Sequence, residues 1–516
     1  MIEQPNVSNV KIKTLSLTDF RAFPGPVPAT FDLDGKNLLV YGENGSGKSS
    51  LFHALQGFFS PTKPSGLLEM RNSFSGAGIG CVKVEVGFDD ASAATWHVGA
   101  GVLRSYLGHT AIGPSVAPVH PGYDAPLNAH VTEAAKFSAV LDYRSLLNTN
   151  YKHEDKTINL FELAVNGFLA NYVDLATNKT IEQLWAAVLR SKPARNTLNT
   201  RVACFNACNA FNNAMNIALG LLLAQAQAIL KTLSPHGLEL VSLPFTNVAY
   251  NNAKAWADKN FTNQTLGLEV SFKGKTLDKP QHYLNEARQS ALALALYLGA
   301  RLACSPQTSP HLKLLVLDDV LVGLDHSNRL PVLNVLVDLF PTWQVVLLTH
   351  DKGWFDLARQ RLPGADWVCY EVYEGDHEAA APMPIVRKTQ NRPAPALLQK
   401  ARDLLLQGYF EAAANYVRQA FDTGLRAACE LKSIKLPYKQ DVSGHQAQDL
   451  LNGLKAWPGT ATVAKADWDA SLARLELMKD VVMNPYSHPN APNIPKQEIV
   501  DAADSVGKFL ELARRK

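Results

Sequence analysis

The stretch Gly42-Glu43-Asn44-Gly45-Ser46-Gly47-Lys48-Ser49 matches the phosphate-binding loop pattern G-x-x-x-x-G-K-[ST] at every required position. The apolar residues 37–41 before it predict a short buried strand, and the periodicity of residues 50–59 after it predicts a helix. In that context, backbone N–H groups of the turn and the N-terminus of the helix can hold phosphate groups. We therefore expect this loop to bind a nucleoside triphosphate, and a chance match of a glycine-rich turn is the alternative.

The side chains of the loop have distinct expected roles. Lys48 would reach the β- and γ-phosphates, and the Ser49 hydroxyl would bind Mg²⁺. The other residues expected to contact ATP here are Gly42, Asn44, Gly45, Gly47 and Ser50.

The composition is that of a globular protein. The chain has 516 residues, enough for two or more domains, with 47% hydrophobic and 19% charged residues. A net charge of +3 gives no general electrostatic case for nucleic acid, so any such contact would need a local basic patch.

The cysteines and the apolar segments indicate in which cellular compartment the protein is expected to be found. Six cysteines occur without a CxxC pair, and the first residues lack a signal-peptide pattern. The most apolar stretch, residues 217–230, is interrupted by Gln225 and Gln227 and is too short to span a bilayer. We expect a reduced, cytoplasmic protein without a membrane segment.

A second group of chemically informative residues follows two apolar runs. Residues 312–317 predict a buried strand that ends in Asp318-Asp319, and residues 344–348 predict another that leads to His350. The carboxyl ends of parallel strands are where an α/β sheet places ligand-binding groups. We expect Asp318 to bind Mg²⁺, Asp319 to orient or deprotonate the attacking water, and His350 to sense the γ-phosphate. Capping aspartates and a core histidine are the alternative, which the order and spacing after the phosphate loop disfavour.

The rest of the chain gives a coarse plan. Residues 81–88 alternate strictly and predict an antiparallel strand, whereas residues 91–135 are expected to form turns and loops. A helical region is expected from Asp142, with a clear helical pattern over 180–233 that breaks at Lys192-Pro193. Strands are expected at 238–244 and 266–272, a linker at 388–396, and helices alone over 397–516.

Together these motifs resemble the ATP-binding-cassette (ABC) heads of the RecF/SMC class. The matching segments are residues 42–49 (Walker A), 284–289 (signature), Asp318-Asp319 (Walker B), Gly323-Leu324-Asp325 (D-loop) and His350 (switch histidine). The segment 19–23 resembles the family's N-terminal segment, whose arginine, here Arg21, lies near the nucleotide. About 270 residues separate Lys48 from Asp318, as in heads that are split around an insertion.

The resemblance implies an α/β fold, an ABC-type ATPase head with a mixed sheet split by a short helical insertion. The head would comprise residues 1–160 and 238–388, with the insertion at 161–237. It also implies an ATPase that uses ATP and Mg²⁺ and forms a homodimer or a higher homo-oligomer around the nucleotides. Asn285 and Asp325 would then contact nucleotide across the dimer.

Two departures from the family pattern shape the expected activity. Asn285 stands where the signature usually has serine, and Glu286-Ala287 replace a pair of small residues. Asp319 replaces the catalytic glutamate, which suggests slow hydrolysis that suits a switch more than a motor. The insertion has neither a hinge domain nor a zinc-hook CxxC, so a cohesin-like ring is disfavoured.

The C-terminal residues 397–516 resemble a HEPN-type helical domain, including those of PrrC-like anticodon nucleases. Residues 409–431 predict an amphipathic helix that carries Arg418, Asp422, Arg426 and Glu430 along one border, and a ladder of ion pairs is the simplest interpretation. The resemblance implies that Arg418 could act with His488, near Asn484, in metal-independent RNA cleavage. The family's usual arginine shortly before the histidine is absent.

Residues 284–288 together with Asp318-Asp319 also resemble ATPases of bacterial anti-phage systems, in which a head of this type controls an attached or separate toxin. This resemblance implies an ATP-dependent switch, in the context of anti-phage defence, that controls an attached effector. One alternative is a scaffold whose C-terminal domain docks and restrains a separate toxin nuclease. Another is a RecF-like DNA repair ATPase. The nucleic acid partner under these hypotheses would be tRNA or DNA.

Overall fold

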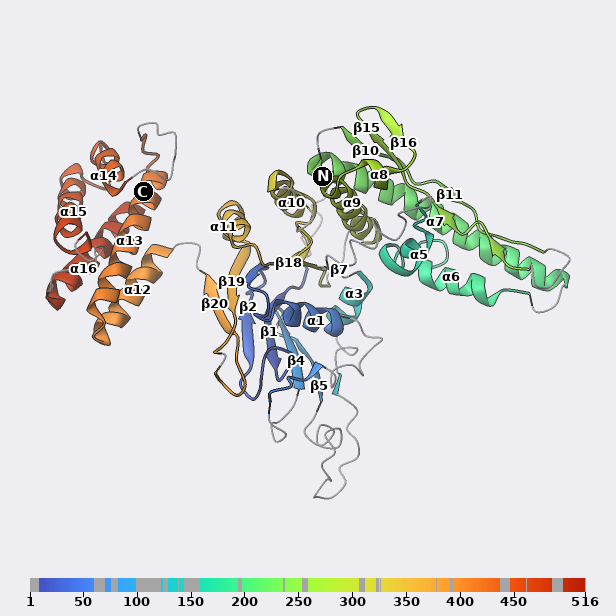
Figure 1. Cartoon of the computed structure of the whole chain (residues 1–516), viewed down its shortest axis with the longest axis horizontal. Helices are drawn as coiled ribbons and strands as arrows, with labels where there is room; N and C mark the ends of the chain where they lie inside the picture. The colour runs from blue at the N-terminus through green and yellow to red at the C-terminus, as the bar shows by residue number, and fades with distance from the viewer. Residues whose placement is uncertain are drawn as a thin grey trace, which may run out of the picture. The chain divides into compact units, whose positions relative to one another are not determined.

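The computed structural model divides the chain into two compact units, Met1–Thr389 and Gln390–Lys516 (Figure 1). The described residues are 9–59, 70–75, 82–98, 122–123, 129–137, 139–142, 158–193, 197–234, 237–252, 259–305, 311–321, 324, 326–376, 378–389, 393–436, 446–460, 462–484 and 495–515.

The first unit is organised around a six-stranded sheet. Its strand order is β20 (Ile385–Thr389), β19 (Trp367–Tyr373), β3 (Asn37–Gly42), β18 (Gln344–Thr349), β17 (Leu314–Asp318) and β7 (Ala139–Asp142). Neighbouring strands are parallel, except that β20 runs antiparallel to β19 at one edge. Every residue of β18 is buried, which explains the apolar run at 345–348, because a strand covered on both faces has no solvent side.

A second, antiparallel sheet packs near the phosphate loop. Its order is β2 (Ala29–Asp32), β1 (Ile12–Thr18), β4 (Val82–Phe88), β5 (Ala93–Val98) and β6 (Gly122–Tyr123). Alternate residues of β4 are buried, which confirms the strand predicted over 81–88. Helix α1 (Lys48–Phe58) shares one hydrophobic core with this sheet and with Leu38 and Val40 of β3.

Two predictions about local structure were wrong. Residues 93–98 form a strand paired with β4, and helix α3 (Ala129–Phe137) follows, where turns and loops were expected. At Asp142 the chain ends β7 instead of beginning a helix, because residues 139–142 pair with β17. The strand at 139–142 is determined by pairing with β17, far along the chain, and the strand at 93–98 by its hairpin with β4, and a local pattern reveals neither pairing.

The insertion is helical, with the predicted break at Lys192-Pro193. Its elements are α5 (Phe161–Leu163), the π-helix η3 (Ala164–Phe168), β8 (Val173–Asp174), β9 (Lys179–Thr180), α6 (Ile181–Arg190) and α7 (Leu198–Leu233). Thr180 and Thr197 begin α6 and α7 with capping boxes, which satisfy backbone N–H groups of the first turn. Helix α7 packs against α9 (Glu286–Cys304), and Figure 1 shows it as the longest element of this unit.

Short antiparallel strands lie between α7 and the helix that follows them. They are β10 (Leu238–Ser242), β11 (Phe245–Thr246), β12 (Ala249–Tyr250), β13 (Phe261–Thr262), β14 (Thr265–Leu266), β15 (Glu269–Phe272) and β16 (Lys275–Leu277), followed by α8 (Pro280–Tyr283). A second core joins these elements, α10 (His326–Leu339) and α11 (Lys352–Arg361) to the large sheet. Leu39 of β3 belongs to this core, so the strand before the phosphate loop is buried on both faces.

Within the described part of the chain, α7 is the one helix long and apolar enough to cross a membrane by length and composition. The core helix of a globular protein passes the same test. Phe211, Met215 and Leu222 of α7 are fully buried, so packing inside the unit accounts for much of its apolar composition.

The second unit is all helical in its described residues. Its helices are α12 (Pro393–Leu406), α13 (Phe410–Leu431), α14 (Ala447–Lys455), α15 (Lys465–Met478), the π-helix η6 (Lys479–Met483) and α16 (Lys496–Arg514). The expected linker at 388–396 is shorter than predicted, because β20 ends at Thr389 and α12 begins at Pro393, where a helix tolerates proline. A mixed sheet with a phosphate loop, split by a helical insertion and followed by an all-helical unit, confirms the predicted fold class.

Candidate functional site

The phosphate loop connects β3 to α1, and two of its glycines are required by geometry. Gly47 caps α1 with a φ of 105°, a left-handed conformation that glycine adopts without strain. At Gly42, an added Cβ would lie 2.4 Å from Ser46 Oγ, so a larger residue would collide with the loop. The chain therefore turns sharply from strand to helix, with Asn44 and Gly45 exposed.

Several backbone N–H donors of the loop are unpaired within the described residues. Among the described residues, nothing accepts a hydrogen bond from the N–H groups of Gly45, Gly47, Lys48 or Ser49. The N–H groups in the first turn of a helix have no intrahelical acceptor, and the helix dipole adds positive potential there. The loop thus offers an anion site built from its backbone.

Lys48 lies inside this loop, where its side chain is 6% exposed. Its Nζ donates to the carbonyl oxygens of Gly42 and, at 3.1 Å, of Glu43. Burial lowers the pKa of Lys48, and the nearby carboxylates of Asp319 and Asp318 oppose that shift. The lysine is therefore held close to both strand-end aspartates.

The three strands that carry the predicted residues end side by side. β18 lies between β3 and β17, and the register pairs Thr349 with Tyr41 and Leu348 with Asp318. The phosphate loop, His350 and the two aspartates consequently meet at one edge of the sheet, as the two apolar runs predicted.

Asp319 and His350 are in direct contact. The Oδ1 atom of Asp319 lies 2.8 Å from Nδ1 of His350 and accepts the backbone N–H of the same residue at 3.0 Å. Both side chains are partly exposed, with Asp319 at 25% and His350 at 41%. The carboxylate is thus oriented by the neighbouring strand while it remains accessible to solvent.

The residues expected to bind Mg²⁺ fit that ion. Ser49 is exposed at the start of α1, and Asp318 is partly buried near Lys48. Among the described residues, no group of three or more His, Cys, Asp or Glu side chains could hold a metal alone. Mg²⁺ characteristically binds through one or two protein oxygens together with phosphate oxygens and water, which suits this pair.

A pocket of about 690 Å³ opens beside the phosphate loop. Arg21, Gly45 and Ser50 line one part of it, and Glu374 and Gly375 line another. Ser50 is buried, and its Oγ accepts the N–H of Ala22 at 3.2 Å, so this side chain fastens the segment around Arg21 to α1. Its expected contact with nucleotide stays a prediction.

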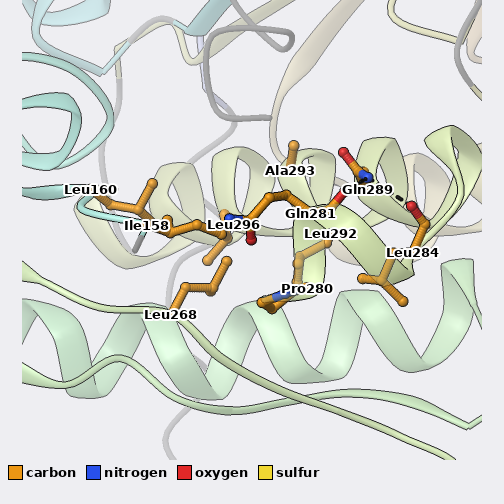
Figure 2. A pocket seen from close by; sticks show the side chains of 10 residues that line it. All are labelled: Ile158, Leu160, Leu268, Pro280, Gln281, Leu284, Gln289, Leu292, Ala293 and Leu296. Carbon is orange, nitrogen blue, oxygen red and sulfur yellow. Dashed lines mark hydrogen bonds between the residues drawn. The ribbon is translucent and has the colours of Figure 1, made fainter. Parts of the chain in front are cut away.

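The signature segment begins α9. Asn285 is the N-cap residue, and its side chain accepts the N–H of Arg288 at 3.2 Å. Figure 2 shows Gln289 bonded to the carbonyl oxygen of Leu284, at 2.7 Å, and Gln289 also donates to Gln281. An apolar cavity beside the signature segment measures about 20 Å³, which is too small for a nucleotide. Its lining residues therefore support the signature segment. Asn285 itself is exposed, and it bonds to Arg288 and Gln289 of its own helix.

Arg329 of α10 was not singled out from the sequence. Its Nε donates to the carbonyl oxygen of Leu324 at 2.9 Å, and its Nη1 bonds Asp351 at 2.6 Å. Asp351 in turn caps α11 by accepting the N–H of Trp354. Arg329 therefore joins the segment after the aspartates to the segment after His350. In the sequence, the only sign of this connection is a basic residue shortly after the D-loop.

Residues 70–75 also lacked a predicted role, although four of them line the pocket beside the loop. The sequence gives no motif there. Asp325 and Gly323 of the D-loop and His488 of the C-terminal unit lie outside the described residues.

In the second unit, Arg418 contacts Asn484. Its Nη1 donates to Oδ1 of Asn484, and its Nε donates to Asp422 at 2.9 Å. The structure thus brings Arg418 of α13 to the residue that follows η6, and it forms one rung of the expected ion-pair ladder. Both interpretations of Arg418 remain open on this geometry.

No family model matches the sequence, and a search of curated proteins finds no match. Among solved structures, RecF with ATP matches at a TM-score of 0.42 and 14% identity, over 74% of this chain and 98% of that one. The SMC head domain from Thermotoga maritima matches at 0.34 and 12%, over 74% and 99%. The Pyrococcus furiosus Smc head bound to the C-terminal domain of ScpA matches at 0.35 and 13%, over 76% and 100%. These values describe a distant likeness to other proteins.

Proposed function

We propose that the first unit binds ATP with Mg²⁺ and hydrolyses it slowly. The observation that carries the proposal is the convergence of the phosphate loop, the two aspartates and His350 at one edge of the sheet. The loop N–H groups and Lys48 would hold the β- and γ-phosphates. Mg²⁺, bound by Ser49 and Asp318, would neutralise charge that develops on the phosphate oxygens.

The chemical step then falls to Asp319. Its carboxylate would accept a proton from water while the water oxygen bonds to the γ-phosphorus and the bond to the β–γ bridging oxygen breaks. The products are ADP and phosphate. His350 would orient the carboxylate through the contact already present. Catalysis of this kind depends mainly on positioning and electrostatics.

The test compares the wild-type full chain with Lys48→Ala by calorimetry with ATP and Mg²⁺ and by phosphate release. We expect the variant to lose both binding and hydrolysis, because it lacks the cation that holds the phosphates. Lys13→Ala, an exposed lysine on β1, is the control. Unchanged ATP affinity in a folded Lys48→Ala protein would refute the assignment.

We further propose a homodimer or a higher homo-oligomer in which Asn285 faces the γ-phosphate bound by the partner subunit. Its exposed position at the start of α9 supports this role, because a helix N-terminus favours an anion. Asp325 would contribute beside it, as the resemblance to RecF/SMC heads implies. Nucleotide-dependent dimerisation, measured by light scattering with and without ATP in the Asp319→Ala variant, tests the arrangement. A variant that stays monomeric with saturating ATP would contradict it.

The nucleotide state would control the helical second unit, in a cytoplasmic anti-phage system. The support is the motif resemblance, and the contact of Arg418 with Asn484 at the end of η6 is compatible with it. In this hypothesis Arg418 and His488 cleave RNA such as tRNA. Expression of the full chain with Arg418→Ala or His488→Ala should remove toxicity while ATPase activity and the melting temperature are retained. Full toxicity from both folded variants would exclude cleavage at these residues.

Two alternatives have distinct outcomes. A docking scaffold would show no RNA cleavage of its own, and a separate toxin nuclease would bind the second unit. A RecF-like repair ATPase would instead bind DNA in an ATP-dependent way. RNA cleavage, partner capture and DNA binding by the same purified full chain would therefore separate the three hypotheses.

A further inference from the structure

The segment 70–75 is fastened to the chain around Arg21 by backbone hydrogen bonds. The N–H of Arg21 donates to the carbonyl oxygen of Met70 at 2.6 Å, and the N–H of Asn72 donates to that of Asp19 at 3.2 Å. Phe20 and Arg71 form an isolated β-bridge between these bonds. The two segments thus form a short ladder beside the phosphate loop.

Buried side chains strengthen this attachment. Arg71 pairs with Asp19 at 3.0 Å, and their side chains are 11% and 0% exposed. Asn72, 4% exposed, donates from Nδ2 to the carbonyl oxygen of Arg21 at 2.5 Å. Its Oδ1 accepts the N–H of Phe74 at 2.8 Å. Because a buried side chain with hydrogen bonds from both of its polar atoms, such as Asn72, fixes a local conformation, the backbone at Phe74 is held in place.

The side chain of Phe74 is nevertheless 67% exposed. A single exposed apolar residue is common on protein surfaces and means little alone. Phe74 differs because it lines the pocket of about 690 Å³ that also includes Gly45 and Ser50. An aromatic ring on a fixed backbone beside an anion-binding loop is suited to a ligand with both a phosphate and a flat ring system.

We propose that Phe74 stacks on the base of the bound nucleotide. The proposal rests on the proposed function, since the phosphate loop must first hold the triphosphate. With the phosphates held at the loop, the sugar and base would extend into the adjoining pocket. Arg21 and Phe74 both line this pocket, and the segments that carry them are hydrogen-bonded to each other. Stacking uses the face of the base, so Phe74 raises affinity for nucleotides over phosphate chains without selecting a particular base.

The experiment compares ATP with inorganic tripolyphosphate, which has the phosphates but no base. Calorimetry with Mg²⁺ measures both ligands on wild-type protein, Phe74→Ala and Phe74→Tyr. We expect Phe74→Ala to weaken ATP binding about tenfold, within the range for losing one aromatic–base stack, and to leave tripolyphosphate binding unchanged. Phe74→Tyr, which keeps the ring, should retain ATP affinity. Phe205→Ala is a matched control, because that ring is 64% exposed on α7.

Each other outcome has a definite meaning. Unchanged ATP affinity in Phe74→Ala overturns the stacking role, and equal losses for both ligands overturn it in favour of a role in shaping the loop. Failure of wild-type protein to bind either ligand overturns the proposed function, and the stacking role with it. Wild-type binding of both ligands with equal affinity would leave nucleotide binding intact but contradict a base contact.

Discussion

A single carboxylate oxygen of Asp319 accepts both the backbone N–H and the imidazole of His350. An ionised carboxylate can only accept, so in this contact an ionised Asp319 requires the ring of His350 to donate from Nδ1. Asp319 also adopts a φ of 51°, and its own N–H donates to the carbonyl oxygen of Leu348. The end of β18 therefore fixes the orientation of the carboxylate that follows β17.

Replacing Asp319 should separate binding from hydrolysis. In Asp319→Ala, Lys48 and Asp318 remain, so ATP affinity should change little, whereas hydrolysis should fall about 10²–10⁴-fold with loss of the proton acceptor. Phosphate release under saturating ATP measures the rate, and Asp338→Ala, an exposed aspartate of α10, is the control. Hydrolysis at the wild-type rate would make Asp319 purely structural.

Arg329 should affect turnover more than binding. Arg329→Ala removes the connection between Leu324 and Asp351, so the segments that flank the aspartates and His350 can shift relative to each other. We expect kcat to fall about tenfold or more, because small misplacements of reacting groups are costly, with little change in KM. Arg361→Ala, an exposed arginine at the end of α11, provides the comparison. A rise in KM with an unchanged kcat would argue against this role.

Asn285 should act on the partner's nucleotide. Mixing Lys48→Ala chains with Asn285→Ala chains creates dimers in which one composite site keeps both groups, so part of the ATPase activity should return. No recovery at any mixing ratio would argue against a shared site. Asn285→Asp keeps an oxygen that can cap α9 but adds a negative charge, so it should impair dimerisation. It should not show the loss of about 1 kcal/mol in the free energy of unfolding that is expected for Asn285→Ala.

The buried thiols predict a pH dependence. Burial raises the pKa of Cys304, Cys369 and Cys429 to about 11, whereas the pKa of a cysteine thiol in an unfolded chain is about 8.5. The folded state therefore holds protons that the unfolded state loses, so the free energy of unfolding should fall as pH rises above about 8.5. Native protein should react slowly with a thiol reagent at pH 8, and denatured protein rapidly. Rapid native labelling of these three cysteines would contradict their burial.

The sequence was sufficient to predict those parts of the site that form one contiguous motif or that come at the end of a buried strand. The loop at 42–49, Asp318-Asp319 and His350 could be placed together because parallel strands share one carboxyl edge. Arg329, Asn72 and Phe74 could not, because their roles depend on contacts between segments without a repeating pattern. The strand at 139–142 was missed for the same reason, since only its pairing with β17 determines it.

Helix α7 is long enough to convert a small rotation within the first unit into a large displacement at its far end. Its 36 residues span about 54 Å at the usual helical rise, and its C-terminal half packs on α9, the helix that Asn285 begins. If dimer closure rotates α9 and α7 together by about 5°, the far end of α7 near Leu198 would travel about 5 Å. Spin labels introduced by Leu198→Cys would report this displacement as an ATP-dependent change in distance. A modest rearrangement at the nucleotide would then be amplified into a movement that another molecule can detect.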